Sequence, residues 1–288
     1  MKWIRRNDDE SNYEDRRGLS TGRRIATGGG LGTIIVLALY LFTGQDFSPV
    51  LNMFNGGTSS QTETVDPARA KENEDLKVFS LGVFNSCNDV WSQIFTKEMG
   101  LEYRKPTFVT FSDETVSECG SANGSTGPFY CPGDEKVYID LSFFHQLSTQ
   151  FNAPGELAMA YVTAHEVGHH IQKLLGLTEK MQQYQGQIPE EQYNQLSVRL
   201  ELQADFYAGL WARYAEKMNI IKLEEGDIES AMNAANAVGD DTLQKRAQGY
   251  TVPDSFTHGT SAQRMRWFMK GYQTGDFRQG DTFNATSL

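Results

Sequence analysis

Apolar residues recur at every third or fourth position through most of the second half of the chain, which is the spacing of helices with one buried face. We expect two long helices, each opened by a proline, over residues 154–175 and 189–218, and shorter helices over 142–151, 227–238 and 261–272. Gly176 follows the first long helix, as glycine commonly does at a helix end. This half of the chain therefore predicts a helical body.

The preceding part of the folded region combines one helix with two strands. A helix is expected over 83–99, and strands over 107–111 and 137–141, where aromatic and β-branched residues are frequent. A short sheet beside a mainly helical body makes the expected fold class α+β. We expect this domain to cover residues 76–288.

An uncharged, mostly apolar segment over residues 25–43 precedes the domain. Roughly 18 or more such residues can cross a bilayer as a helix. Two arginines come directly before the segment and Asp46 is the first charge after it, so the positive-inside rule places residues 1–24 in the cytoplasm and the domain outside. Residues 44–75, rich in small polar residues and ending in a charged stretch, are expected to form a flexible linker.

Two alternatives to this transmembrane anchor stay open. A cleaved signal peptide needs a small-x-small cleavage site, and the sequence around Thr43 is a poor one. A buried core helix is the other, although the run Gly28-Gly29-Gly30 suits a membrane helix better than a core helix.

Composition and charge narrow the function classes. The chain has 288 residues, is 39% hydrophobic and carries a formal net charge of −11, which argues against nucleic acid as a partner. Cys119 and Cys131 bracket a turn rich in Gly, Ser and Asn and are a candidate disulfide, with two small buried thiols as the alternative. Cys87 is left over.

The first chemical signal is His165-Glu-Val-Gly-His169 in the middle of the first long helix. Positions i and i+4 lie on one helix face, so the two imidazoles can hold one metal ion. Glu166 follows the first ligand and is placed to activate the attacking water without binding the metal. A pattern of this kind also arises by chance, so the site needs support from elsewhere in the chain.

That support comes from Glu201 and Asp205, four residues apart in the second long helix and surrounded by apolar residues. Such a position is unfavourable for charge unless a cation is near. We expect Glu201 to be the third zinc ligand and Asp205 to accept a hydrogen bond from a ligating imidazole. An exposed acidic pair on a helix surface is the alternative interpretation.

A third element lies before the last helix. His258 is expected to donate a hydrogen bond to the oxyanion of the reaction, with Asp254 orienting it. Arg264 is expected to bind Glu201, Asp205 or the substrate. In a rival arrangement His258 is the third ligand and Glu201 is structural. His145 and His170 are expected to have structural roles.

The segments HEVGHH (165–170), ELQADFYAG (201–209) and THGTSAQR (257–264) resemble the bacterial neutral zinc metallopeptidase family, as do the N-terminal residues and GPFYCP (127–132). The resemblance covers nearly the whole chain. It implies a zincin-like domain anchored in the inner membrane and facing the periplasm, with Glu201 as ligand and Asp205 supporting the site. In the wider class an edge strand binds extended substrate, and residues 127–141 are the candidates here.

We therefore expect a zinc-dependent endopeptidase tethered to the membrane, acting on a peptide or protein. Glu166 takes a proton from water and later delivers it to the leaving amine, while His258 stabilises the oxyanion. Two alternatives remain open: a non-catalytic, membrane-tethered module in which zinc pins two helices, and a metal-assisted hydrolase of a non-peptide amide.

Overall fold

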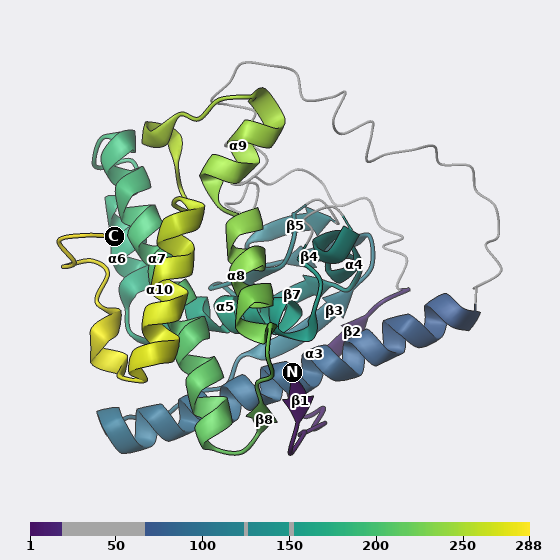
Figure 1. Ribbon diagram of the computed structural model, residues 1–288. Helices are drawn as coiled ribbons and strands as arrows, with labels where there is room; N and C mark the ends of the chain where they lie inside the picture. Colours follow the sequence, from purple (N-terminus) through teal and green to yellow (C-terminus); the bar gives the residue numbers. More distant parts are fainter. Residues whose placement is uncertain (19–66, 124–125, 150–152) are drawn as a thin grey trace.

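The computed structural model describes residues 1–18, 67–123, 126–149 and 153–288 (Figure 1). This part of the chain is mainly helical with a small sheet, which confirms the predicted α+β class. The helices are α3 (Pro67–Ile94), α4 (Ser142–Thr149), α5 (Glu156–Leu174), α6 (Leu177–Tyr184), α7 (Glu190–Lys217), α8 (Asp227–Ala237), α9 (Asp240–Gln248) and α10 (Ser261–Thr274). Short helical turns are η2 (Phe95–Met99), η3 (Pro253–Ser255) and η4 (Phe277–Gly280).

A four-stranded sheet has the strand order β2-β3-β7-β6. The parallel strands β2 (Tyr13–Arg16), β3 (Thr107–Phe111) and β7 (Lys136–Asp140) are followed by β6 (Phe129–Cys131), which runs antiparallel to β7 and forms one edge. Two smaller pairs are the β4 (Glu114–Ser117) and β5 (Gly120–Asn123) hairpin, and β1 (Lys2–Trp3) with β8 (Ile221–Lys222). The two strands predicted from sequence are thus present as β3 and β7.

The sheet packs on α3, which passes below β2 and β3 in Figure 1. Phe108 of β3 stacks on Phe84 of α3 with ring centroids 5.0 Å apart. The opposite side of β3 presents Val109 and Phe111 to a second small apolar cluster. Both faces of this strand are therefore buried, which explains why its residues are almost all apolar or β-branched.

Glycines allow the three central helices to approach closely. A Cβ on Gly209 of α7 would lie 1.9 Å from the carbonyl oxygen of Phe268 on α10, and a Cβ on Gly168 of α5 would lie 3.2 Å from the Cα of Ala204 on α7. Figure 1 shows α7 and α10 side by side. The crossing of α5 and α7 at Gly168 lies one residue before His169, so it brings α7 against the histidine-bearing face of α5.

Cys119 and Cys131 form a disulfide that joins the turn of the β4–β5 hairpin to the edge strand β6. This confirms the predicted bridge. Cys87 is a free and fully buried cysteine of α3, as expected for the thiol left over.

Residues 1–18 are part of the domain. Strand β2 pairs with β3, and the Asn85 side chain on α3 donates hydrogen bonds to the carbonyl oxygens of Asn7 and Asp9, both at 2.9 Å. The expectation that residues 1–24 lie across a membrane from the domain is therefore wrong for residues 1–18, because a strand cannot pair with a sheet on the other side of a bilayer. The two arginines directly before the apolar segment, on which this prediction relied, lie outside the described residues.

The expected linker over residues 44–75 also needs correction, since α3 begins at Pro67. Proline at a first helical position and the Ala, Arg, Lys and Glu residues that follow it favour a helix over a flexible chain. The expected transmembrane segment, 25–43, lies outside the described residues. Within the described ranges, no helix combines the length and the apolar character that a membrane crossing needs.

Candidate metal centre

His165, His169 and Glu201 meet where α5 and α7 cross. The ligand atoms of these three side chains all lie within 4.8 Å of one another. The Nε2 atom of His165 lies 3.2 Å from Glu201 Oε2, and the Nε2 atom of His169 lies 3.4 Å from Glu201 Oε1. The structure thus brings together the two histidines of one helix and the carboxylate predicted on another, more than 30 residues later in the chain.

These residues fit a zinc ion. Two imidazole nitrogens and one carboxylate oxygen are the donor set of catalytic zinc sites, which leave a further coordination position open. Each imidazole also has its Nδ1 engaged elsewhere, His165 with Asp205 and His169 with Gln172, both at 2.9 Å. Both Nε2 atoms are therefore left to face Glu201, as metal ligation requires.

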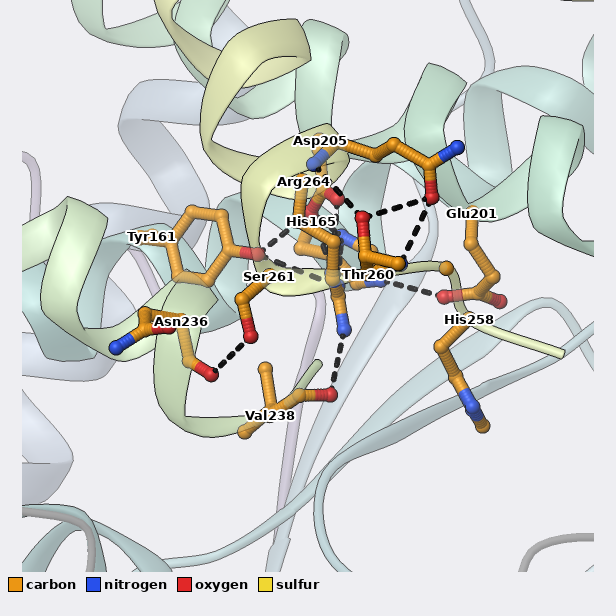
Figure 2. A network of polar contacts seen from close by, with 12 residues as sticks. Tyr161, His165, Glu201, Asp205, Asn236, Val238, His258, Thr260, Ser261 and Arg264 are labelled. Atoms are coloured by element: carbon orange, nitrogen blue, oxygen red, sulfur yellow. Dashed lines mark hydrogen bonds and ion pairs between the residues drawn. The ribbon is translucent and has the colours of Figure 1, made fainter. Parts of the chain in front are cut away.

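Asp205 anchors the first of these imidazoles from a fully buried position. Its Oδ1 accepts hydrogen bonds from His165 Nδ1 at 2.9 Å and from the Tyr161 hydroxyl at 2.5 Å. Arg264 donates to both carboxylate oxygens, at 2.9 and 3.0 Å (Figure 2). Asp205 and Arg264 thus occupy the supporting positions expected for them, while Tyr161 was not predicted.

The charges in this cluster balance locally. Burial alone would raise the pKa of Asp205, but the Arg264 guanidinium and His165 lower it to about 2, so the group stays ionised. Burial opposes charge on His165, yet Asp205 and Glu201 raise the pKa of this imidazole to about 10. The same negative field would favour a divalent cation, which would take the place of the proton on Nε2.

His258 is held by Asp240 rather than by the predicted Asp254. The Oδ2 atom of Asp240 accepts hydrogen bonds from the backbone N–H groups of Thr257, His258 and Gly259, at 2.6–3.0 Å. Its Oδ1 lies 3.1 Å from His258 Nδ1 and accepts that proton as well.

Asp254 instead lies in η3, where its carbonyl oxygen accepts a hydrogen bond from Asn194. Sequence proximity favoured Asp254, whereas the fold returns the 257–259 loop to the start of α9. Burial disfavours charge on His258, but Asp240 and then Glu201 raise the pKa of the imidazole.

Of the two other histidines, His170 has the structural role predicted for it. His170 is fully buried, donates through Nε2 to the Arg104 carbonyl oxygen at 2.7 Å and accepts from the Tyr130 hydroxyl at 2.9 Å. Burial lowers the pKa of His170 to about 4, so the ring stays neutral at physiological pH. His145 is exposed on α4 and is not among the converging ligands, and its predicted structural role stays a prediction.

Comparison with known proteins agrees with this geometry. The chain matches the family described as "Putative neutral zinc metallopeptidase" over residues 1–283. It is 42% identical over 291 aligned positions to the uncharacterized protein YpfJ of Escherichia coli, with 99% of this chain and 100% of that protein covered. It is also 43% identical over 214 positions to an uncharacterized protein of Mycobacterium tuberculosis, covering 71% of this chain and 69% of that protein.

No solved structure matches the chain. The family match nevertheless extends over nearly all of its residues, including the N-terminal strands and both metal-site helices. The chain therefore belongs to the neutral zinc metallopeptidase family.

Proposed function

We propose that this protein is a zinc-dependent endopeptidase. The observation that carries the proposal is the convergence of His165, His169 and Glu201, with Glu166 directly beside the first ligand on α5. Three protein ligands with a neighbouring carboxylate suit catalysis better than structure, because structural zinc sites are usually closed by four protein ligands. This geometry disfavours the alternative of a zinc ion that only pins two helices.

Zinc bound at this site would supply an activated water and polarise the scissile carbonyl. Glu166, 8% exposed on α5, takes the proton from the attacking water and transfers it to the leaving amine. His258 donates a hydrogen bond to the developing oxyanion. Asp240 keeps that imidazole oriented through Nδ1, which leaves Nε2 for the substrate.

Strand β6 is the proposed binding edge for the substrate backbone. Within the described part of the chain, β6 pairs with β7 alone, which leaves its other edge available for an extended peptide. Tyr130 of β6 contacts His170 of α5, so this edge lies beside the helix that carries the zinc ligands. Of the residues 127–141 expected from sequence, we therefore propose the three residues of β6 as the binding edge.

We further propose that the domain works outside the cytoplasm. The Cys119–Cys131 disulfide supports an oxidising compartment. Since residues 1–18 pair with the domain, they share that compartment. A membrane tether formed by residues 25–43 remains a prediction from sequence; with both flanks in one compartment, this segment would enter the membrane and return to the same side instead of crossing it once.

Cleavage profiling of a proteome-derived peptide library by mass spectrometry tests the peptidase activity. We expect the full-length protein to cut internal peptide bonds, to lose this activity on chelation and to regain it with zinc. The Glu201→Gln variant should be inactive, while Glu190→Gln, which changes an exposed carboxylate in the first turn of the same helix, should cleave normally. Equal cleavage by Glu201→Gln, or hydrolysis of non-peptide amides alone, would contradict the proposal.

A further inference from the structure

The two histidine ligands have different hydrogen-bond partners. His165 donates to a buried carboxylate, whereas His169 donates through Nδ1 to the side-chain oxygen of Gln172, at 2.9 Å. Gln172 is fully buried and lies one turn after His169 on α5. A buried amide facing a metal ligand can present either its oxygen or its nitrogen, and only the oxygen accepts the Nδ1 proton.

The neighbours of Gln172 determine which end faces His169. Its Nε2 donates to the Leu200 carbonyl oxygen at 2.6 Å and to Gln203 Oε1 at 3.2 Å. Gln203 in turn donates through Nε2 to the carbonyl oxygen of Gly280, at 2.9 Å. Because backbone carbonyls only accept hydrogen bonds, Leu200 and Gly280 fix the direction of both amides.

We propose that Gln172 is the positioning residue for His169 and that Gln203 fixes the orientation of its amide. The hydrogen bonds run in one direction, from His169 to Gln172, to Gln203 and to Gly280. They hold the proton of His169 on Nδ1 and leave the Nε2 lone pair for the cation. The bond to Leu200 also ties α5 to α7 one residue before Glu201, so Gln172 acts on two of the three ligands.

The lack of charge on the Gln172 amide also matters for the proposed site. Asp205 is paired with Arg264, so Glu201 and the general base Glu166 are the carboxylates left to balance a cation bound at this site. A carboxylate at position 172 would add another buried anion and would face the oxygens of Leu200 and Gln203. An amide orients His169 without reducing the positive charge available to polarise a substrate carbonyl.

Zinc affinity, measured by competition with a chromophoric chelator, tests this inference, which rests on the proposed zinc site. We expect Gln172→Met to weaken zinc binding about 10- to 100-fold. Gln203→Met, which removes one of the two groups that orient the amide, should weaken it severalfold. Gln195→Met, an exposed change on α7, should bind zinc like the wild type.

Nitrogen-15 NMR of histidine-labelled, zinc-loaded protein reports on the Nδ1–H proton of His169 directly. A general change in packing around position 172 would not remove this signal. The wild type should show a slowly exchanging Nδ1–H signal for His169, and this signal should be lost or exchange rapidly in Gln172→Met. If Gln172→Met does not fold, the same comparison applies to Gln203→Met. Unchanged zinc affinity with an unchanged Nδ1–H signal would overturn the inference, whereas a wild type that binds no zinc would overturn the proposed function itself.

Discussion

Glu166→Gln should lower the rate of peptide cleavage by about a thousandfold while leaving zinc affinity within about twofold of the wild type. The amide has nearly the same size as the carboxylate but cannot accept the proton of the attacking water. Glu166 is not among the three converging ligands, so the metal site itself should persist. Cleavage kinetics on one peptide, with zinc content measured on the same samples, give both quantities.

The matched control is Glu156→Gln, which makes the same chemical change in the first turn of the same helix. Its side chain is about half exposed, and we expect normal activity. Retention of full activity by Glu166→Gln would rule out the assigned role. Loss of zinc together with activity would instead show that Glu166 is a ligand.

Arg264→Met should lower the free energy of unfolding by about 3–5 kcal/mol. Arg264 and Asp205 are both buried, and the guanidinium donates hydrogen bonds to both carboxylate oxygens. Removing it leaves an ionised group in the core without its balancing charge. Urea denaturation followed by circular dichroism measures the change.

Arg266→Met serves as the control on α10, because Arg266 is exposed and its guanidinium donates a hydrogen bond to the carbonyl oxygen of Leu288 at the C-terminus. We expect this variant to lose less than about 1 kcal/mol, as is usual for surface positions. Equal losses for Arg264→Met and Arg266→Met would show that the buried ion pair with Asp205 does not stabilise the fold.

The metal ligands were predictable because their signals are local and periodic. His165 and His169 share a helix face by spacing alone, and Glu201 stood out as a charge within an apolar helix. The histidine pair on α5 and the carboxylate on α7 could therefore each be found from sequence alone. Because both are typical zinc ligands, the sequence also suggested that they meet. The close approach at Gly168 that makes this possible is visible only in the structure.

The groups that orient the site were less predictable. Asp240 acts on His258 through a loop that folds back over 18 residues, and Gln172 depends on backbone carbonyls at Leu200 and Gly280. Neither contact follows from helical or strand periodicity. Asp254, close in sequence to His258, was chosen for that reason and proved wrong.

The N-terminal segment shows how a charge pattern can mislead. The positive-inside rule placed the whole N-terminal segment on the cytoplasmic side, yet Arg16 and Arg17 belong to the domain. Arg16 pairs there with Glu14 and Arg17 with Asp15, each at 2.6 Å. Strand β2 is only four residues long and pairs with a strand about 90 residues later. Four residues are too few to show a clear strand pattern in the sequence, and the pairing partner of β2 is too distant to be inferred from it.

The position of zinc in crystals of the metal-loaded protein, located by anomalous diffraction at the zinc edge, tests the central claim most directly. The account predicts one zinc ion per chain, about 2.0–2.2 Å from the Nε2 atoms of His165 and His169 and from a carboxylate oxygen of Glu201. Zinc bound elsewhere in the chain, or bound to the two histidines with Glu201 turned away and another protein group in its place, would contradict it.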